Sequence, residues 1–155
     1  MSDVLYRLSE SADIPILAHL RARDWGSPEY WENRIRGYLE GAVNPQHALA
    51  PRACHVAVER SAVVGFVAGH LTRRHGCEGE LEWINVIPER RRSGIASGLL
   101  RLLAGWFVAQ NALRICVDVE PSNAAARAFY HRHGAEKLNE HWLVWNDIRI
   151  VTSGR

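Results

Sequence analysis

ELEWINVIPERRRSGIASGLLRLLAGWFVAQ, residues 80–110, predicts a buried strand, a basic loop and a long amphipathic helix. The run Leu81–Val86 is apolar and contains Trp, Ile and Val, which favour a pleated surface. Pro88 ends this strand because it offers no N–H to a neighbouring strand. The helix that follows has one wide apolar face, formed by Ile95, Leu99, Leu102, Leu103, Trp106 and Phe107.

The loop between strand and helix has the chemistry of an anion site. The first turn of a helix carries N–H groups without helical partners and a partial positive charge. Gly94 lets a ligand approach the backbone closely, and the arginines at 90–92 form charge-assisted bonds to phosphate. We therefore expect the loop to bind a diphosphate; the alternative is an ordinary turn with solvated arginines. The pattern fits neither the Walker loop nor the Gly-x-Gly-x-x-Gly fingerprint.

A second strand and helix follow. Leu113, Ile115, Val117 and Val119 alternate with polar or smaller residues, which is typical of a strand. The strand–helix–strand order requires a crossover, so Leu81–Val86 and this strand should be parallel neighbours. Asn123 then caps a short helix, residues 124–133, that Gly134 ends.

These two elements together resemble the GNAT superfamily of N-acetyltransferases. The stretch Val86–Ala96 is similar to the acyl-CoA loop of that family, with Arg91, Gly94 and Ala96 at its defining positions. The second element is residues 117–123, followed by Phe129-Tyr130 and His133-Gly134-Ala135. The resemblance extends from Gly65 to Ala135. Ala135 departs from it, since the family usually has Phe there.

The resemblance implies an α/β (α+β) fold of GNAT type in a single domain, residues 1–155. The expected sheet is mixed and mostly antiparallel, with a splayed parallel strand pair at its centre and about four flanking helices. A length of 155 residues, 47% hydrophobic and 23% charged, agrees with one globular domain.

Outside the central stretch, we expect a strand at Val4–Leu8 and helices over residues 11–23 and 27–41. Residues 44–52 have two prolines and no periodicity, which predicts a loop. A hairpin follows, with strands at Cys54–Glu59 and Val63–Thr72; Gly65 and Gly69 suggest a bulge or a close backbone approach. Trp142–Trp145 predicts a closing hairpin that is either core or a homodimer edge, and residues 149–155 a frayed tail.

By resemblance, acetyl-CoA is the cofactor. Its pantetheine arm would bond the strand backbone at Ile84, Asn85 and Val86, with a further bond from Asn123. Its diphosphate would lie in the loop formed by Arg91, Arg92, Ser93, Gly94, Ile95, Ala96 and Ser97.

Tyr130 is the predicted general acid. It lies seven residues after Asn123, so both share a helix face about 10 Å apart along the axis. A phenol with a pKa near 10 can protonate a departing thiolate with a pKa of roughly 8 to 10. The alternative is a buried core tyrosine.

Three carboxylates are candidate bases: Glu80, Glu82 and Asp118. Period-two alternation places Glu80 and Glu82 on the same strand face as Ile84 and Val86, so either could take the ammonium proton. Like-charged neighbours would raise one pKa toward neutrality. We expect Glu80 to be the base; a structural carboxylate is the alternative for each.

The first two helices cover the acceptor site in the resembling family, so Asp24, Trp25, Tyr30 and Trp31 are candidate walls for the acceptor. Packing on the sheet is the alternative for these aromatics.

Net charge, hydropathy, cysteines and histidines argue against several classes of partner. A net charge of +2 without a basic aromatic stripe argues against nucleic acid, and no apolar segment predicts a signal peptide or membrane span. Cys54, Cys77 and Cys116 are read as reduced thiols in a cytoplasmic protein. The histidines, including His70, lack zinc-site spacing, so no metal is expected.

The predicted function is acetyl transfer from acetyl-CoA to a primary amine, either a small amine or a protein N-terminus, by direct attack in a ternary complex. The alternative is a catalytically weak acyl-CoA-binding sensor or interaction module.

Overall fold

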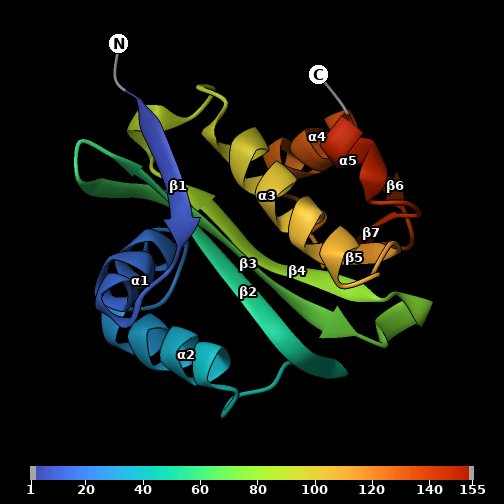
Figure 1. Cartoon of the computed structure of the whole chain (residues 1–155), viewed down its shortest axis with the longest axis horizontal. Coiled ribbons are helices and arrows are strands. Elements are labelled where there is room, and N and C mark those ends of the chain that lie inside the picture. The colour runs from blue at the N-terminus through green and yellow to red at the C-terminus, as the bar shows by residue number, and fades with distance from the viewer. Residues whose placement is uncertain (1–2, 154–155) are drawn as a thin grey trace.

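The computed structural model describes residues 3–153 and has a seven-stranded mixed sheet (Figure 1). The strand order is β1-β2-β3-β4-β5-β7-β6. The strands are β1 Val4–Leu8, β2 Ala48–Glu59, β3 Ala62–Thr72, β4 Gly79–Val86, β5 Ile115–Asp118, β6 Glu136–Lys137 and β7 Trp142–Trp145. The helices are α1 Ile14–Ala22, α2 Pro28–Glu40, α3 Ile95–Ala109, α4 Ala124–Arg132 and α5 Arg149–Ser153.

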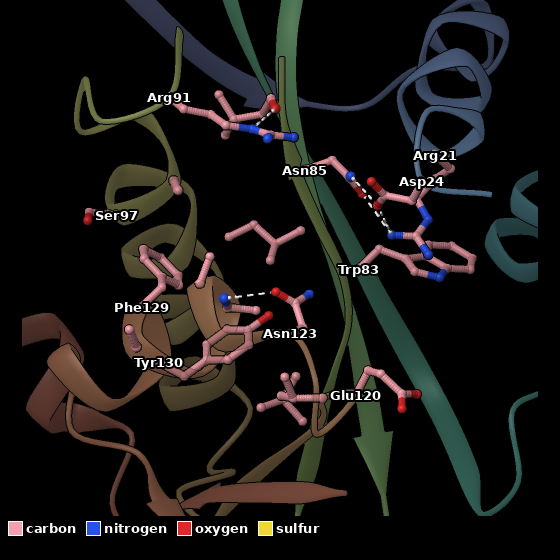
Figure 2. Close-up of a pocket in the computed structure, with 18 of the residues that line it drawn as sticks. Arg21, Asp24, Trp83, Asn85, Arg91, Ser97, Glu120, Asn123, Phe129 and Tyr130 are labelled. Atoms are coloured by element: carbon pink, nitrogen blue, oxygen red, sulfur yellow. Dashed lines mark hydrogen bonds and ion pairs between the residues drawn. The ribbon is translucent and has the colours of Figure 1, made fainter. Parts of the chain in front are cut away.

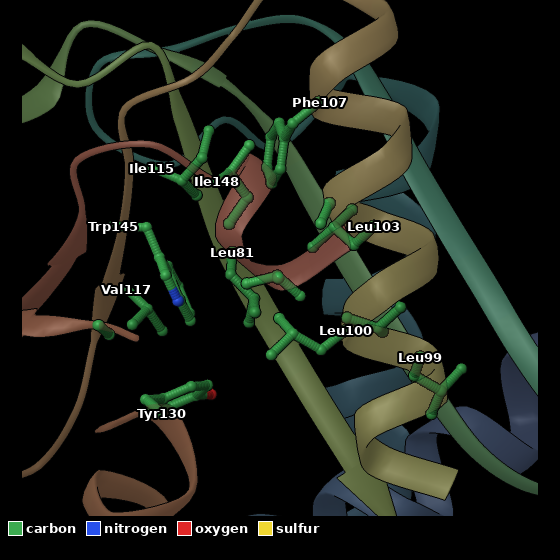
Figure 3. Close-up of a cluster of buried hydrophobic side chains, with 14 of the residues drawn as sticks. Leu81, Leu99, Leu100, Leu103, Phe107, Ile115, Val117, Tyr130, Trp145 and Ile148 are labelled. Carbon is green, nitrogen blue, oxygen red and sulfur yellow. The ribbon is translucent and has the colours of Figure 1, made fainter. Parts of the chain in front are cut away.

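The helices cover both faces of the sheet. The pair α1 and α2 lies on one face, whereas α3, α4 and α5 lie on the other (Figure 1). Under α3, the side chains of Leu103 and Phe107 point toward Leu81 and Ile115 on the central strands, and Leu99 belongs to the same buried cluster (Figure 3). This arrangement confirms the predicted α/β class with a mostly antiparallel sheet and a central parallel pair.

The glycines of β3 allow α3 to approach the sheet closely. A Cβ atom added at Gly69 would lie 2.9 Å from the carbonyl oxygen of Glu80 and 3.0 Å from Leu103 Cδ2. One at Gly65 would lie 3.3 Å from Leu99 Cδ1. The prediction of a close backbone approach at these two positions is confirmed.

A bulge in β4 changes which way its side chains face. Gly69 pairs with Leu81 and Ala68 pairs with Trp83, so Glu82 is the extra residue on β4. As a result, Leu81 packs under α3 while Trp83 packs with α1 and α2, although regular alternation would put both on one face.

The bulge corrects one prediction. Glu80 and Glu82 do not share a face with Ile84 and Val86, because alternation is interrupted between them. Both carboxylates face α2 through their contacts with His70, whereas Ile84 and Val86 pack on the α3 side.

The parallel strands diverge beyond the bulge. Pairing between β4 and β5 runs from Gly79–Ile115 to Leu81–Val117 and stops there, yet β4 continues to Val86. The predicted splayed pair is therefore confirmed, and the divergence opens a gap at the centre of the sheet.

Two predictions about irregular segments were wrong. Residues 44–52 are not wholly a loop, because β2 begins at Ala48 and pairs with Thr72 of β3. The segment after Arg149 is not a frayed tail up to residue 153: it forms α5, a fifth helix, because Ile148 and Val151 are apolar at helical spacing and pack into the core with α3. Residues 154–155 of the predicted tail lie outside the described residues.

The aromatic residues of the last hairpin lie within the domain. Trp145 is buried in the main core, and Trp142 is half-buried beside His75. A homodimer therefore stays a prediction.

Across residues 3–153, the helices are too short or too polar to cross a bilayer.

Candidate active site

A cavity of about 1020 Å³, here called the central cavity, fills the gap between β4 and β5. Figure 2 shows Tyr130, Asn123 and Phe129 on the α4 side of the cavity, facing Trp83, Asn85 and Arg21. Of the predicted site residues, those lining it are Asp24, Trp25, Glu82, Ile84, Asn85, Val86, Arg91, Arg92, Gly94, Ala96, Ser97, Asp118, Asn123 and Tyr130.

The basic loop forms one end of the cavity. Arg92 and Gly94 adopt left-handed backbone conformations, with φ of 62° and 86°. Apart from its chain neighbours, no atom of the described residues lies within 4 Å of the position that a Cβ of Gly94 would take, so a ligand can reach the helix N-terminus. Arg91 donates from Nε to the Val86 carbonyl oxygen at 3.3 Å, which holds it beside the open edge of β4.

This end of the cavity carries groups that suit an anion. Arg91 and Arg92 line it beside the first turn of α3, whereas the guanidinium of Arg90, which also lines it, pairs with Glu59 at 2.8 Å. Guanidinium groups and free helix N–H groups therefore lie at the same end of the cavity. Two residues of the predicted loop lie outside the lining: the Ile95 side chain is buried in the core, and the Ser93 hydroxyl donates to the carbonyl oxygen of Arg90.

Tyr130 lies deeper in the cavity and is 5% exposed. Its ring packs edge-on against Trp145, with centroids 5.6 Å apart. Burial raises the pKa of its hydroxyl above the usual value, and the charge of Arg21 opposes the shift. Asn123 caps α4 by accepting a 3.1 Å hydrogen bond from the Ala126 N–H, which places both side chains on the same wall.

Glu82 lines the opposite side. Burial, followed by the charge of Glu80, raises the pKa of its carboxyl group. Arg34 lies 3.6 Å away and His70 3.9 Å away, and both oppose the shift. A carboxylate with a raised pKa beside a cavity can accept a proton near neutral pH.

Glu80 lies behind this wall and does not line the cavity. It is 4% exposed, and its Oε1 is 3.1 Å from Arg74 Nε and 3.4 Å from His70 Nε2. These contacts give Glu80 the surroundings of a structural carboxylate. The potential ligand atoms of His70, Glu80 and Glu82 lie within 4.8 Å of one another, a grouping that sequence spacing did not suggest.

Asp118 lines the cavity from the end of β5 and is exposed. Partial burial raises the pKa of its carboxyl group, while His141 opposes this and Glu80 adds to it.

Of the residues predicted to form the acceptor wall, some line the cavity and others do not. Asp24 and Trp25 line the cavity, and Trp25 is 57% exposed. Tyr30 is exposed but lies outside the lining. Trp31 is buried, packs against Trp83, and donates from Nε1 to the Trp25 carbonyl oxygen at 2.7 Å, so it supports the wall from behind.

Sequence reasoning missed Arg21. Its guanidinium lies 4.5 Å over the Trp31 ring and donates to Asn85 Oδ1 at 3.0 Å. Burial lowers its pKa, while nearby Asp24 and Glu82 act to raise it. The sequence did contain a signal for Arg21, because it lies on the same face of α1 as the buried residues Ile14 and Leu17. A charged residue on a buried helix face needs a polar or charged partner.

Solved structures with a similar fold cover nearly the whole chain. A GNAT-family protein from Desulfovibrio desulfuricans superposes with a TM-score of 0.75 at 16% identity, covering 94% of this chain and 99% of that one. PaiA N-acetyltransferase from Thermoplasma acidophilum, solved with coenzyme A, gives 0.68 at 16%, with the same coverages of 94% and 99%.

Diaminobutyrate acetyltransferase EctA from Paenibacillus lautus, in complex with L-2,4-diaminobutyric acid and coenzyme A, gives a TM-score of 0.67 at 19% identity, covering 96% and 97%. No curated protein matches the sequence significantly. The model of the Acetyltransferase (GNAT) family matches residues 15–135, most of the chain. The chain therefore belongs to the acetyltransferase (GNAT) family and is an acyltransferase that uses acetyl-CoA.

Proposed function

We propose that the protein transfers the acetyl group of acetyl-CoA to a primary amine, by direct attack of the amine within a ternary complex. The observation that carries this proposal is the central cavity, in which a cationic loop lies at one end and Glu82 and Tyr130 line the walls. Acetyl-CoA supplies an activated thioester carbonyl. The protein must then hold two reactants together, take one proton and give another.

The residues that bind coenzyme A in this proposal lie along the gap between β4 and β5. The loop from Arg91 to Ser97 holds the diphosphate, with Ser93 and Ile95 supporting the turn. Beyond Leu81, the β4 edge facing β5 is unpaired, so the backbone at 84–86 can bond an extended pantetheine arm as a further strand would. Asn123 lines the same path from the other wall.

Glu82 is the general base in this proposal. An amine is protonated at neutral pH, so it must lose a proton before it can attack. Glu82 lines the cavity and its pKa is raised, whereas Glu80 is held by Arg74 behind the wall. Asp118, at the cavity edge, is the second candidate.

Tyr130 is the general acid. Its hydroxyl borders the cavity, and the neutral phenol is the form that can donate a proton to a departing thiolate. The raised pKa keeps it in that form over the working pH range.

The acceptor enters on the α1 side, past Asp24 and Trp25. The substrate of the diaminobutyrate acetyltransferase is L-2,4-diaminobutyric acid. We propose a small amine or a protein N-terminus as the acceptor class here.

A thiol-release assay over small amines and N-terminal peptides tests the proposal. At least one acceptor should raise thiol release well above hydrolysis of acetyl-CoA alone. If calorimetry detects tight acetyl-CoA binding but no acceptor increases thiol release, the protein is instead an acyl-CoA-binding sensor or interaction module.

A further inference from the structure

A second cavity, here called the basic pocket, lies next to the first. Its volume is about 550 Å³, and it is formed by α3, the end of α4 and α5. Ser97 and Arg132 line both cavities, so the two spaces adjoin at these residues. The lining consists of Ser97, Arg101, His131, Arg132, His133, Gly134, Ile150 and Val151.

The basic pocket is lined by groups that suit an anion. Two arginines and two histidines lie on its walls, and within residues 3–153 neither Asp nor Glu does. His133 Nε2 lies 3.0 Å from Ser97 Oγ, which joins the wall of α4 to that of α3. Burial lowers the pKa of His133, and the charges of Arg101 and Arg132 lower it further. Both guanidinium groups therefore lie near the His133 ring.

The distance between the basic pocket and the basic loop indicates which anionic group the pocket would bind. Ser97 lies in the first turn of α3 and Arg101 follows one turn later, about 6 Å along the helix. Coenzyme A carries two anionic groups on one ribose, the 5′-diphosphate and the 3′-phosphate. With the diphosphate at residues 91–97, the 3′-phosphate falls within reach of Arg101 and Arg132.

We propose that the basic pocket binds the 3′-phosphate of coenzyme A and thereby selects acetyl-CoA over its dephospho form. This inference rests on the proposed placement of the diphosphate. Arg101 is the deciding residue because it lines only the basic pocket, whereas Arg132 also faces the central cavity. Guanidinium groups bind a phosphate monoester through charge-assisted, often bidentate bonds.

The test is calorimetric titration with acetyl-CoA and with acetyl-dephospho-CoA. Wild type should bind acetyl-CoA roughly 10- to 100-fold more tightly, as expected for the loss of one or two charged hydrogen bonds. Arg101→Gln should lose most of that preference by weakening acetyl-CoA binding alone. Arg36→Gln is the matched control, because Arg36 lies on α2 outside both cavities and pairs with Glu32.

Equal affinity of wild type for both compounds, or an undiminished preference in Arg101→Gln, would overturn the inference while leaving acetyl-CoA binding intact. If neither compound bound, the proposed function itself would fail. Inorganic phosphate distinguishes a free anion from the coenzyme: it should bind together with acetyl-dephospho-CoA but be excluded by acetyl-CoA. Phosphate binding that acetyl-CoA leaves unchanged would assign the pocket to a free anion and contradict the proposal.

Discussion

Tyr130 and Glu82 line one cavity, and burial favours the protonated form of each. The two residues nevertheless take opposite roles. Tyr130 keeps its proton and is suited to donate it, whereas Glu82 has a carboxyl pKa raised toward the range in which a base works efficiently.

Tyr130→Phe should lower kcat about 100-fold or more, while the affinity for acetyl-CoA changes by no more than about twofold. The substitution removes the hydroxyl and keeps the ring that packs against Trp145. Steady-state kinetics with the best acceptor, together with calorimetry, measures both quantities. Tyr30→Phe is the control, since Tyr30 lies outside the cavity. An unchanged kcat in Tyr130→Phe would remove the general-acid assignment.

Glu82→Gln should lower kcat/KM about 100-fold and change its pH dependence. The base works only when deprotonated and its pKa is raised, so wild-type kcat/KM should fall as pH decreases through that raised pKa. The Gln variant should lack this limb. Asp118→Asn, measured in parallel, should keep it. If Asp118→Asn lost the limb and Glu82→Gln kept it, Asp118 would be the base.

Sequence reasoning identified most of these residues but could not rank them. Motif positions led to Arg91, Gly94, Asn123 and Tyr130 because each belongs to a local pattern. Arg21 was missed because its partner Asn85 lies 64 residues away in sequence. Such long-range pairs depend on tertiary packing, which local periodicity does not encode.

At the scale of elements, the bulge in β4 decides the site. It turns Glu82 and Trp83 toward α2 and ends the pairing with β5 at Leu81. Periodicity predicted the strand, the helix and their parallel crossover correctly. It could not predict the bulge, because one extra residue reverses every later side chain without altering composition.

Gly69→Ala should destabilise the protein by about 1–3 kcal/mol, because a Cβ there would press against Leu103 and the Glu80 backbone. Gly105→Ala is the matched control within α3. Within residues 3–153, no heavy atom other than the local backbone of α3 lies within 4 Å of its Cβ position. Ala also favours helix, so the substitution should stabilise the protein by about 0.5–1 kcal/mol. Urea denaturation measures both. Equal effects of the two substitutions would show that α3 does not rest on Gly69.

At the scale of the molecule, the sheet consists of two parts joined at a short seam. The first four strands form a continuous antiparallel unit, and β5, β6 and β7 form another. Parallel pairing at residues 79–81 with 115–117 joins them, and α3 packs across the junction. The strand–helix–strand order was enough to predict the parallel pair, since such a crossover has few solutions. The mostly antiparallel sheet around that pair was expected from the family resemblance.

Because the seam is short, a ligand in the central cavity should act as a second connection between the two parts. Acetyl-CoA should therefore slow amide hydrogen exchange locally at residues 84–97 on one part and 119–130 on the other, as measured by mass spectrometry. The turn at residues 41–43, which follows α2, lies outside the cavity lining and is the internal control. Ligand binding also suppresses global unfolding, which slows the most protected amides everywhere by one common factor. Only amides that exchange through local opening report the position of the ligand. Two results would contradict a coenzyme that spans the gap between β4 and β5. In one, amide exchange slows only by the common factor that global stabilisation produces; in the other, local exchange slows in only one of the two segments.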